Sequence, residues 1–183
     1  MGLANKITIL RILLVPVLLI GLLYYKVGNE TLRFAVLGLF VVCGMTDAID
    51  GYIARRFYQK TKIGSILDPL ADKILILTAY ISLSTLENIP LASKIPPWLT
   101  IIVMSRDTII LLGLAIIFVV NKEMEIKPSI MGKITTFIQM LTVIAALLHF
   151  NLIYVLWWVC AFFTIISGFG YVWRGTKVLN EAH

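Results

Sequence analysis

Residues 45–72, MTDAIDGYIARRFYQKTKIGSILDPLAD, place four aspartates beside strongly apolar segments of the chain. Asp47 and Asp50 are three residues apart, and Asp68 and Asp72 are four residues apart. On a helix, either spacing puts both carboxylates on one face. A carboxylate removed from water loses several kcal/mol of hydration free energy unless a cation compensates its charge. The stretch therefore predicts two helices whose carboxylates share a cation.

The composition indicates a membrane protein. Of the 183 residues, 60% are hydrophobic and 14% are charged, whereas about 25% are charged in ordinary soluble domains. Six apolar spans have about the length that crosses a bilayer, at residues 7–25, 32–55, 69–86, 98–120, 129–149 and 152–173. We therefore predict an all-α integral membrane protein that forms one domain over residues 1–183.

Basic residues are distributed unevenly between the two sides of the predicted membrane. They cluster before the first span, after the second, around the start of the fifth and after the last. The positive-inside rule then places both termini and the 56–67 loop in the cytoplasm. The net charge of +6 fits anionic lipid headgroups better than nucleic acid. We expect a multi-pass protein of the inner or plasma membrane with no nucleic-acid partner.

The four aspartates predict a divalent-metal site. The segment between the two pairs is short, so their helices should be antiparallel neighbours whose carboxylates meet at one depth. Carboxylates that converge in a low dielectric stay ionised together only around a multivalent cation. Ligation by oxygen alone favours Mg²⁺, Mn²⁺ or Ca²⁺ over zinc or copper.

Simpler roles for individual aspartates remain open. Asp68 could be the N-cap of a helix with Pro69 at its first position. Asp47 or Asp50 could form a structural ion pair with Arg55. A divalent-cation transporter could also place carboxylates in a membrane, but it predicts carboxylates near mid-membrane and repeat symmetry, whereas these aspartates gather at one side of the bilayer.

Small residues beside the aspartates predict a phosphate-bearing ligand. Gly51 lies in a predicted helix, where glycine costs about 1 kcal/mol relative to alanine, so a close approach to the backbone is expected there. Ala54 and Gly64 are also small and leave space for a ligand in the same region. Arg55 can donate two hydrogen bonds to phosphate oxygens. Together these residues fit the diphosphate of a ligand that also carries a nucleotide.

The spacing of these residues resembles a known signature. The pattern Asp-x2-Asp-Gly-x2-Ala-Arg-x8-Gly-x3-Asp-x3-Asp, from Asp47 to Asp72, fixes eight residues over 26 positions and matches that of the CDP-alcohol phosphotransferases. NKITILRILLVP (residues 5–16), SRD (105–107) and GKITTFIQM (132–140) look like segments of the phosphatidylglycerophosphate synthases within that family.

The resemblance implies a fold and an active site. It implies six transmembrane helices around a polar cavity open to the cytoplasm, in a homodimer. Two divalent ions, Mg²⁺ or Mn²⁺, would be bound by four carboxylates: Asp47, Asp50, Asp68 and Asp72. The nucleotide of CDP-diacylglycerol would be held by Gly51, Ala54, Arg55 and Gly64. Asp72 would also be the general base, taking the proton of the acceptor hydroxyl.

The acceptor is predicted from the remaining basic residues within or beside spans, Arg11, Arg106 and Lys133. A cation there is expected to have an anionic partner, so an acceptor with a phosphate is favoured, although Asp107 offers Arg106 a structural pairing. Glycerol 3-phosphate, which gives phosphatidylglycerophosphate, is the simplest choice. The alternatives are phosphatidylglycerol and inositol phosphate. Phosphatidylglycerol is the acceptor in the eukaryote-type cardiolipin synthases, which look similar to this chain through LDPLADKILI (residues 67–76) and SRD.

Overall fold

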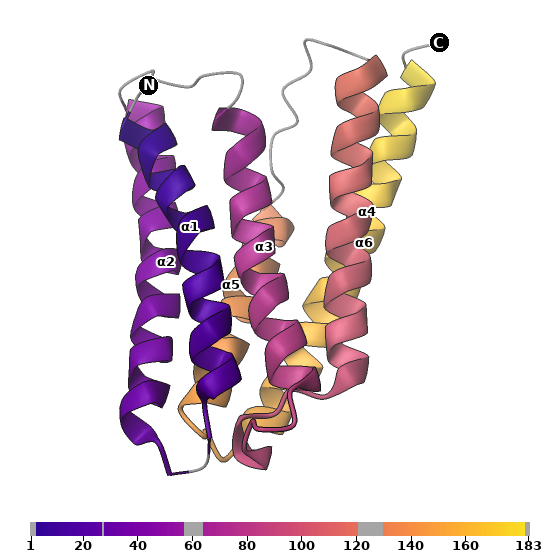
Figure 1. The fold of residues 1–183 in the computed structure, drawn as a ribbon. Coiled ribbons are helices and arrows are strands. Elements are labelled where there is room, and N and C mark those ends of the chain that lie inside the picture. The colour runs from indigo at the N-terminus through magenta and orange to yellow at the C-terminus, as the bar shows by residue number, and fades with distance from the viewer. Residues whose placement is uncertain (1–2, 27, 57–63, 121–129, 182–183) are drawn as a thin grey trace. The chain divides into compact units, whose positions relative to one another are not determined.

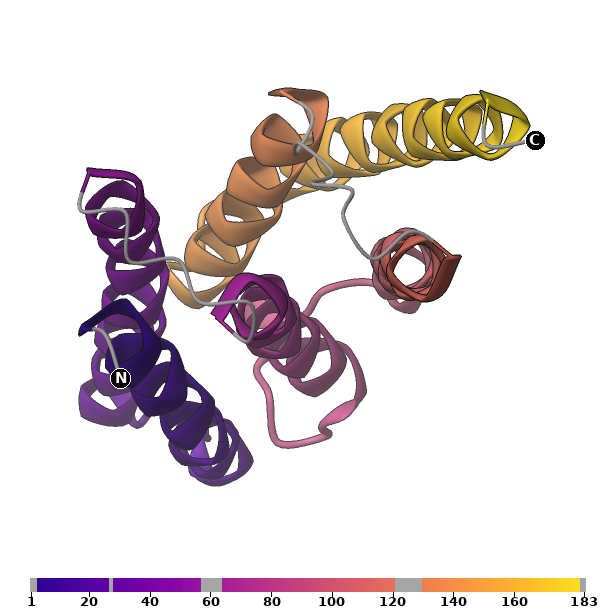
Figure 2. The same ribbon diagram turned by 90° about the horizontal axis from the view of Figure 1, so that it is seen from above.

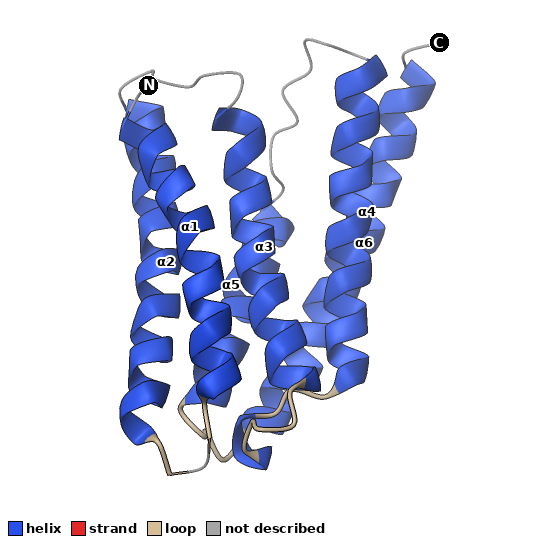
Figure 3. Ribbon diagram, in the orientation of Figure 1, coloured by secondary structure: helices blue, strands red, loops and turns tan. Residues whose placement is uncertain are grey.

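The structure, a computed structural model, describes the backbone of residues 3–26, 28–56, 64–120 and 130–181 and the side chains of 9–26, 28–46, 70–113 and 130–173. Within these ranges it is helical and contains no strand (Figures 1 and 3). The elements are α1 (Leu3–Tyr24), α2 (Glu30–Arg56), α3 (Gly64–Thr85), η1 (Leu91–Ser93), α4 (Pro97–Val120), α5 (Ile130–Leu147) and α6 (Ile153–Glu181). Each of the six predicted spans coincides with one α-helix apart from its ends.

The start of α3 differs from the sequence-based expectation. The helix begins at Gly64, four residues before Asp68, so the prediction that Asp68 is its N-cap is wrong. Pro69 is the sixth residue of α3. Its fixed φ near −65° suits a helix, although its missing N–H removes one backbone hydrogen bond from the second turn. Pro69 therefore does not force the helix to begin at that residue.

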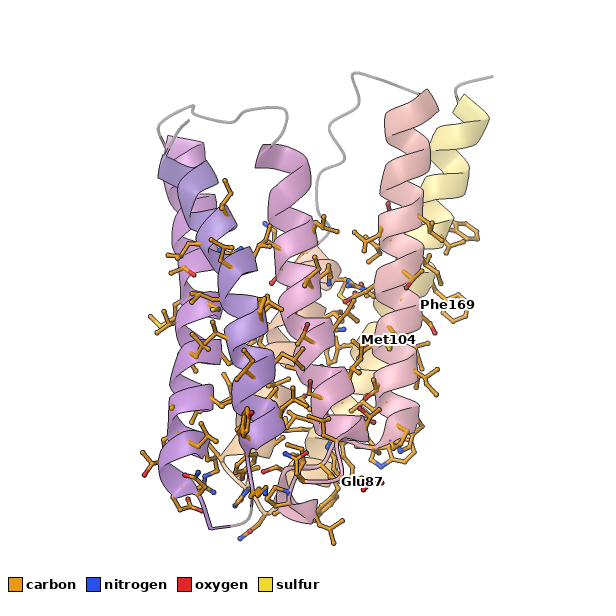
Figure 4. All side chains as sticks on the ribbon, viewed as in Figure 1. Glu87, Met104 and Phe169 are labelled. Carbon is orange, nitrogen blue, oxygen red and sulfur yellow. The ribbon has the colours of Figure 1, made fainter. Side chains whose placement is uncertain are left out.

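Several helices are apolar enough to cross a membrane. Among the described residues, three helical segments meet that requirement in length and hydropathy: Leu91–Gly113, Ile130–Leu147 and Ile153–Trp173. A fourth apolar helix, Ile9–Tyr24, is shorter. Large apolar side chains also face outward, as Figure 4 shows for Phe169 on α6, which is 75% exposed. Exposed apolar faces of this kind are typical of surfaces that contact lipid.

The chain divides into two compact units. Unit 1 comprises Met1–Ile95 and Val143–Phe150, and it contains α1, α2, α3, η1 and the last residues of α5. Unit 2 comprises Pro96–Thr142 and Asn151–His183, and it contains α4, α6 and the first part of α5.

In unit 1, α1 packs along both α2 and α3 (Figure 2). Leu18, Phe40 and Leu75, one from each helix, are fully buried. Gly21 allows α1 and α2 to approach closely, because a Cβ atom at that position would lie 2.7 Å from Cγ2 of Val36. The turn from α1 to α2 contains Gly28, whose φ of 89° is readily adopted by glycine alone.

In unit 2, α4 packs against α6. Near one end, the rings of Trp98 and Trp158 lie 5.1 Å apart between centroids. Farther along, a Cβ atom at Gly113 would lie 2.7 Å from the Tyr171 ring, whose hydroxyl donates a hydrogen bond of 3.3 Å to the Ile110 carbonyl. These contacts fix the relative position of the two helices that carry Arg106 and its partners.

Candidate functional site

The four aspartates lie on helical segments at one end of unit 1. The chain leaves α2 and enters α3 at the same end, where α1 also begins (Figure 1). We call this the aspartate end. Since α2 and α3 run in opposite directions there and contact each other, the predicted antiparallel arrangement of the two helices is confirmed.

The positions along the helices place Asp47, Asp72 and Arg11 at a common depth. At 1.5 Å per residue, Arg11 lies about 12 Å inside the start of α1, and Asp72 lies about 12 Å inside the start of α3. Asp47 lies roughly 13 Å before the end of α2 by the same spacing. All three are thus about two helical turns below the aspartate end. Asp50 and Asp68 are nearer to it.

The described side chains at this depth are polar and mostly buried. Arg11 is 2% exposed although α1 is otherwise strongly apolar. Asp72 is half-buried, and its Oδ1 is shielded from solvent. Lys73, the next residue, is buried as well. The aspartate end therefore holds charges inside the helix packing, where they interact more strongly than in water.

The remaining predicted residues of this site have described backbones only. They lie in the helical segments that end α2 and begin α3, and the structure does not describe their side chains. These residues are Asp47, Asp50, Gly51, Ala54, Arg55, Gly64 and Asp68. The metal and nucleotide assignments of these residues stay predictions. The donor set nevertheless suits a hard divalent ion, because carboxylate oxygens from two adjacent helices are the ligands that Mg²⁺ and Mn²⁺ prefer.

Arg106 of α4 lies within unit 2 and is 5% exposed. Its Nη1 is 2.6 Å from Oδ1 of Asp107, which is fully buried. Its Nη2 donates a hydrogen bond of 2.8 Å to Oγ of Ser167 on α6. The structural pairing with Asp107 that the sequence suggested is thus present. A role for Arg106 toward the acceptor stays a prediction.

The α5–α6 contact in unit 2 carries further polar side chains. Thr135 donates a hydrogen bond of 3.1 Å to the Phe163 carbonyl, and Nε2 of Gln139 lies 3.4 Å from Oγ1 of Thr164. Lys133, two residues before Thr135, is exposed. Arg11 belongs to unit 1, whereas Arg106 and Lys133 belong to unit 2. The convergence of these three cations around one acceptor therefore stays a prediction.

The sequence reasoning missed Ser167 as the partner of Arg106. The two residues are 61 positions apart, and α6 is otherwise dominated by apolar residues. A serine followed by glycine within such a helix was the available signal. A Cβ atom at Gly168 would lie 3.5 Å from Cγ of Arg106, so the arginine stem lies directly over this Ser-Gly pair.

A second polar cluster, also missed, lies at the end of unit 1 opposite to the aspartates, which Glu87 marks in Figure 4. We call it the histidine end. Nδ1 of His149 is 2.6 Å from Nη1 of Arg33, and Nε2 is 3.0 Å from the Tyr25 hydroxyl. The Tyr25 hydroxyl is also 3.3 Å from Oγ of Ser93. His149 has a φ of 55°, a conformation that histidine adopts more readily than most residues.

The hydrogen-bond directions at the histidine end follow from the donor inventory. A guanidinium only donates, so Nδ1 of His149 accepts from Arg33, and Nε2 carries the proton that is donated to Tyr25. The Tyr25 hydroxyl is then available to donate to Ser93. Burial and the neighbouring Arg33 lower the pKa of His149, while Glu30 opposes the shift. These hydrogen bonds join protein groups to one another, although Nε of Arg33 is buried without a hydrogen-bond partner among the described residues.

Comparison with known proteins gives the family. The family model described as CDP-alcohol phosphatidyltransferase matches residues 1–166. The chain is 36% identical to the CDP-diacylglycerol–glycerol-3-phosphate 3-phosphatidyltransferase of Bacillus subtilis strain 168, over 98% of this chain and 99% of that protein.

Two further relatives have different names. A probable phosphatidylglycerophosphate synthase of Mycobacterium tuberculosis is 32% identical, over 96% of this chain and 82% of its own length. The human cardiolipin synthase (CMP-forming) is 33% identical, over 96% of this chain and 62% of its own length. The match extends over nearly the whole chain, including the aspartates and both units. The chain is a membrane enzyme of phospholipid biosynthesis and belongs to the CDP-alcohol phosphatidyltransferase family.

Proposed function

We propose that this enzyme transfers the phosphatidyl group of CDP-diacylglycerol to a hydroxyl of glycerol 3-phosphate, releasing CMP and forming phosphatidylglycerophosphate. The observation that carries this proposal is the similarity to the Bacillus subtilis enzyme named for that reaction, which extends over essentially the full length of both chains. Membership of an enzyme family also argues against the divalent-cation transporter.

In the reaction, the acceptor hydroxyl oxygen attacks the phosphorus that carries diacylglycerol. The bond from this phosphorus to the oxygen of CMP breaks, and CMP leaves. Asp72 takes the proton of the attacking hydroxyl and later releases it to water. Its depth, about two helical turns inside α3, and its half-buried carboxylate suit a base that is partly screened from solvent.

Two divalent ions, Mg²⁺ or Mn²⁺, would be held by Asp47, Asp50, Asp68 and Asp72. When bound, they supply positive charge that neutralises the diphosphate and the departing CMP. Arg55 would donate hydrogen bonds to the diphosphate, while Gly51, Ala54 and Gly64 leave room for the cytidine. Positioning of this kind accounts for most of the rate enhancement in phosphoryl transfer.

We further propose a membrane arrangement in which all six helices cross the bilayer around a polar cavity. The aspartate end and both termini would face the cytoplasm, and two chains would form a homodimer. The uneven distribution of basic residues supports this orientation. Single cysteines introduced at Gln59 and Asn151 should react with an impermeant thiol reagent from opposite sides of the membrane. Reaction of both from the same side would contradict the orientation.

Cardiolipin synthesis from phosphatidylglycerol is the second candidate. It is favoured by the 33% identity to the human and rat cardiolipin synthases. The chain covers 62% of the length of those proteins, compared with 99% of the Bacillus subtilis enzyme, so we place glycerol 3-phosphate first. Inositol phosphate remains a third acceptor.

The choice of acceptor is tested with purified protein and labelled CDP-diacylglycerol. Glycerol 3-phosphate, phosphatidylglycerol and inositol phosphate are offered separately, and the product lipid is identified by mass. We expect CMP release and phosphatidylglycerophosphate with glycerol 3-phosphate. Cardiolipin as the main product would replace the first candidate by the second. No CMP release with any acceptor would contradict the proposed reaction class.

A further inference from the structure

The Arg106 guanidinium has one hydrogen-bond donor that the described residues leave unused. Nη1 binds Asp107 and Nη2 binds Ser167, as described above. Nε, by contrast, is shielded from solvent and makes no hydrogen bond. Burying a guanidinium N–H without an acceptor is costly. An acceptor that arrives with a ligand can satisfy such a donor.

The two occupied nitrogens determine the direction of the third. A guanidinium is planar and rigid, with its donors in a fixed fork. Asp107 is on the same helix as Arg106, whereas Ser167 belongs to α6. Anchoring Nη1 to one and Nη2 to the other fixes the plane of the group and hence the line along which Nε–H points. The stem of Arg106 also passes close to α6, because a Cβ atom at Gly168 would lie 3.5 Å from its Cγ.

We propose that Ser167 is a positioning residue for the acceptor: with Asp107, its hydroxyl holds Arg106 so that Nε–H donates to a phosphate oxygen of glycerol 3-phosphate. This inference rests on the proposed function and adds a residue of α6 to the site. Ser167 itself does not touch the substrate. Its hydroxyl oxygen accepts from Nη2, and the effect of losing it reaches the substrate through Arg106 alone.

The alternative is that Ser167 only stabilises the contact of α4 with α6. A structural role would lower the thermal midpoint and affect both substrates alike, because the fraction of folded enzyme would fall. A positioning role weakens binding of one substrate only. The ratio of the two KM values therefore separates the roles.

The experiment compares Ser167→Ala with the matched variant Ser105→Ala. The Ser105 hydroxyl lies one residue before Arg106 but donates only to the Ile101 carbonyl of its own helix. In Ser167→Ala we expect the KM for glycerol 3-phosphate to rise roughly 3- to 10-fold, as for a weakened hydrogen bond to a charged group. The KM for CDP-diacylglycerol should stay unchanged in both variants, and Ser105→Ala should behave as wild type for both substrates.

A double-mutant cycle tests the route through Arg106. Arg106→Lys keeps a cation beside Asp107 but removes the Nε–H donor. In that background, Ser167→Ala should change the acceptor KM no further. An unchanged acceptor KM in Ser167→Ala, a parallel rise for both substrates, or a full additional rise in the Arg106→Lys background would each overturn the inference.

The wild-type assay separates this inference from the function on which it rests. If the wild-type enzyme forms no phosphatidylglycerophosphate from glycerol 3-phosphate, the proposed function fails, and this inference fails with it. If the wild type turns over but Ser167→Ala has a normal acceptor KM, only the inference fails.

Discussion

The two ends of unit 1 differ in the partners of their polar side chains. At the histidine end, Tyr25, Arg33, Ser93 and His149 bind one another, and Nδ2 of Asn88 lies within 3.0 Å of the carbonyls of Leu22, Leu23 and Tyr25. At the aspartate end, carboxylates are concentrated on two adjacent helices together with the buried Arg11. The first arrangement joins protein groups to one another, whereas the four carboxylates of the second are predicted to share divalent cations.

This contrast separates stability from activity. Hydrogen bonds between protein groups that join distant segments contribute to the free energy of unfolding. Like charges held close together reduce it, and they are retained where a ligand or a reaction needs them. Substitutions at the histidine end should therefore lower stability with little effect on turnover. Substitutions at the aspartate end should do the reverse.

The largest expected effect is that of Asp72→Asn. It removes the proposed base, so kcat should fall roughly 10²- to 10⁴-fold, the usual contribution of a general base. The thermal midpoint should stay close to that of wild type, because asparagine has nearly the same shape and volume as aspartate. Both quantities are measured on the same purified sample, by CMP release and by thermal unfolding in detergent. Full activity of this variant would refute the role of Asp72.

Asn88→Ala should produce the opposite profile. Nδ2 of Asn88 caps the last carbonyls of α1, at 2.6 Å from the Tyr25 carbonyl, and its loss should cost about 1–3 kcal/mol of stability. For a chain of this size, each kcal/mol lowers the thermal midpoint by about 2–4 °C. kcat measured well below that midpoint should match wild type.

Thr85→Ala provides the control for Asn88→Ala. The Thr85 hydroxyl donates only to the Ile81 carbonyl within its own helix and is exposed, so its removal should leave both stability and kcat nearly unchanged. If Asn88→Ala reduced kcat as strongly as Asp72→Asn does, the separation of the two ends would be broken.

The smallest expected effect is a pH dependence of stability at the histidine end. The pKa of His149 is lowered in the folded protein by burial and by Arg33, against the opposing effect of Glu30. The unfolded chain therefore binds the proton more readily, and stability falls as the pH drops below the ordinary histidine pKa of about 6.5. Above that pH the contribution is fully present.

The matched variant is His149→Asn, which cannot titrate but tolerates the positive φ of this position. We expect the thermal midpoint of wild type to fall by a few degrees more than that of His149→Asn when the pH is lowered from 7.5 to 5.5. Equal decreases in the two proteins would show that His149 does not carry the pH dependence.

The sequence predicted the aspartate end because its signals are local. The spacing of Asp47, Asp50, Asp68 and Asp72 within 26 positions fixes helix faces directly, and the hydrophobic spans gave the helices that carry them. The start of α3 was mispredicted because a proline near the beginning of a helix suggests position N1, while the helix extends one further turn to Gly64.

The histidine end and the Ser167 contact could not be predicted in this way. His149 and Tyr25 are 124 residues apart, and Arg106 and Ser167 are 61 apart. Apart from Arg106, which lies in the SRD stretch, each is a single common polar residue with no spacing motif around it. Only the packing of helices brings these pairs together, so the structure was needed to find them.

The central claim is that the carboxylates of the aspartate end bind two divalent ions. The most direct measurement is a titration of purified protein with Mn²⁺ in the presence of CDP-diacylglycerol, followed by electron paramagnetic resonance, for wild type, Asp68→Asn and the histidine-end control Asn88→Ala. We predict two bound Mn²⁺ per chain in wild type and Asn88→Ala, with weakened binding in Asp68→Asn. Wild type that binds no Mn²⁺, or Asp68→Asn that binds two ions as tightly as wild type, would contradict the account.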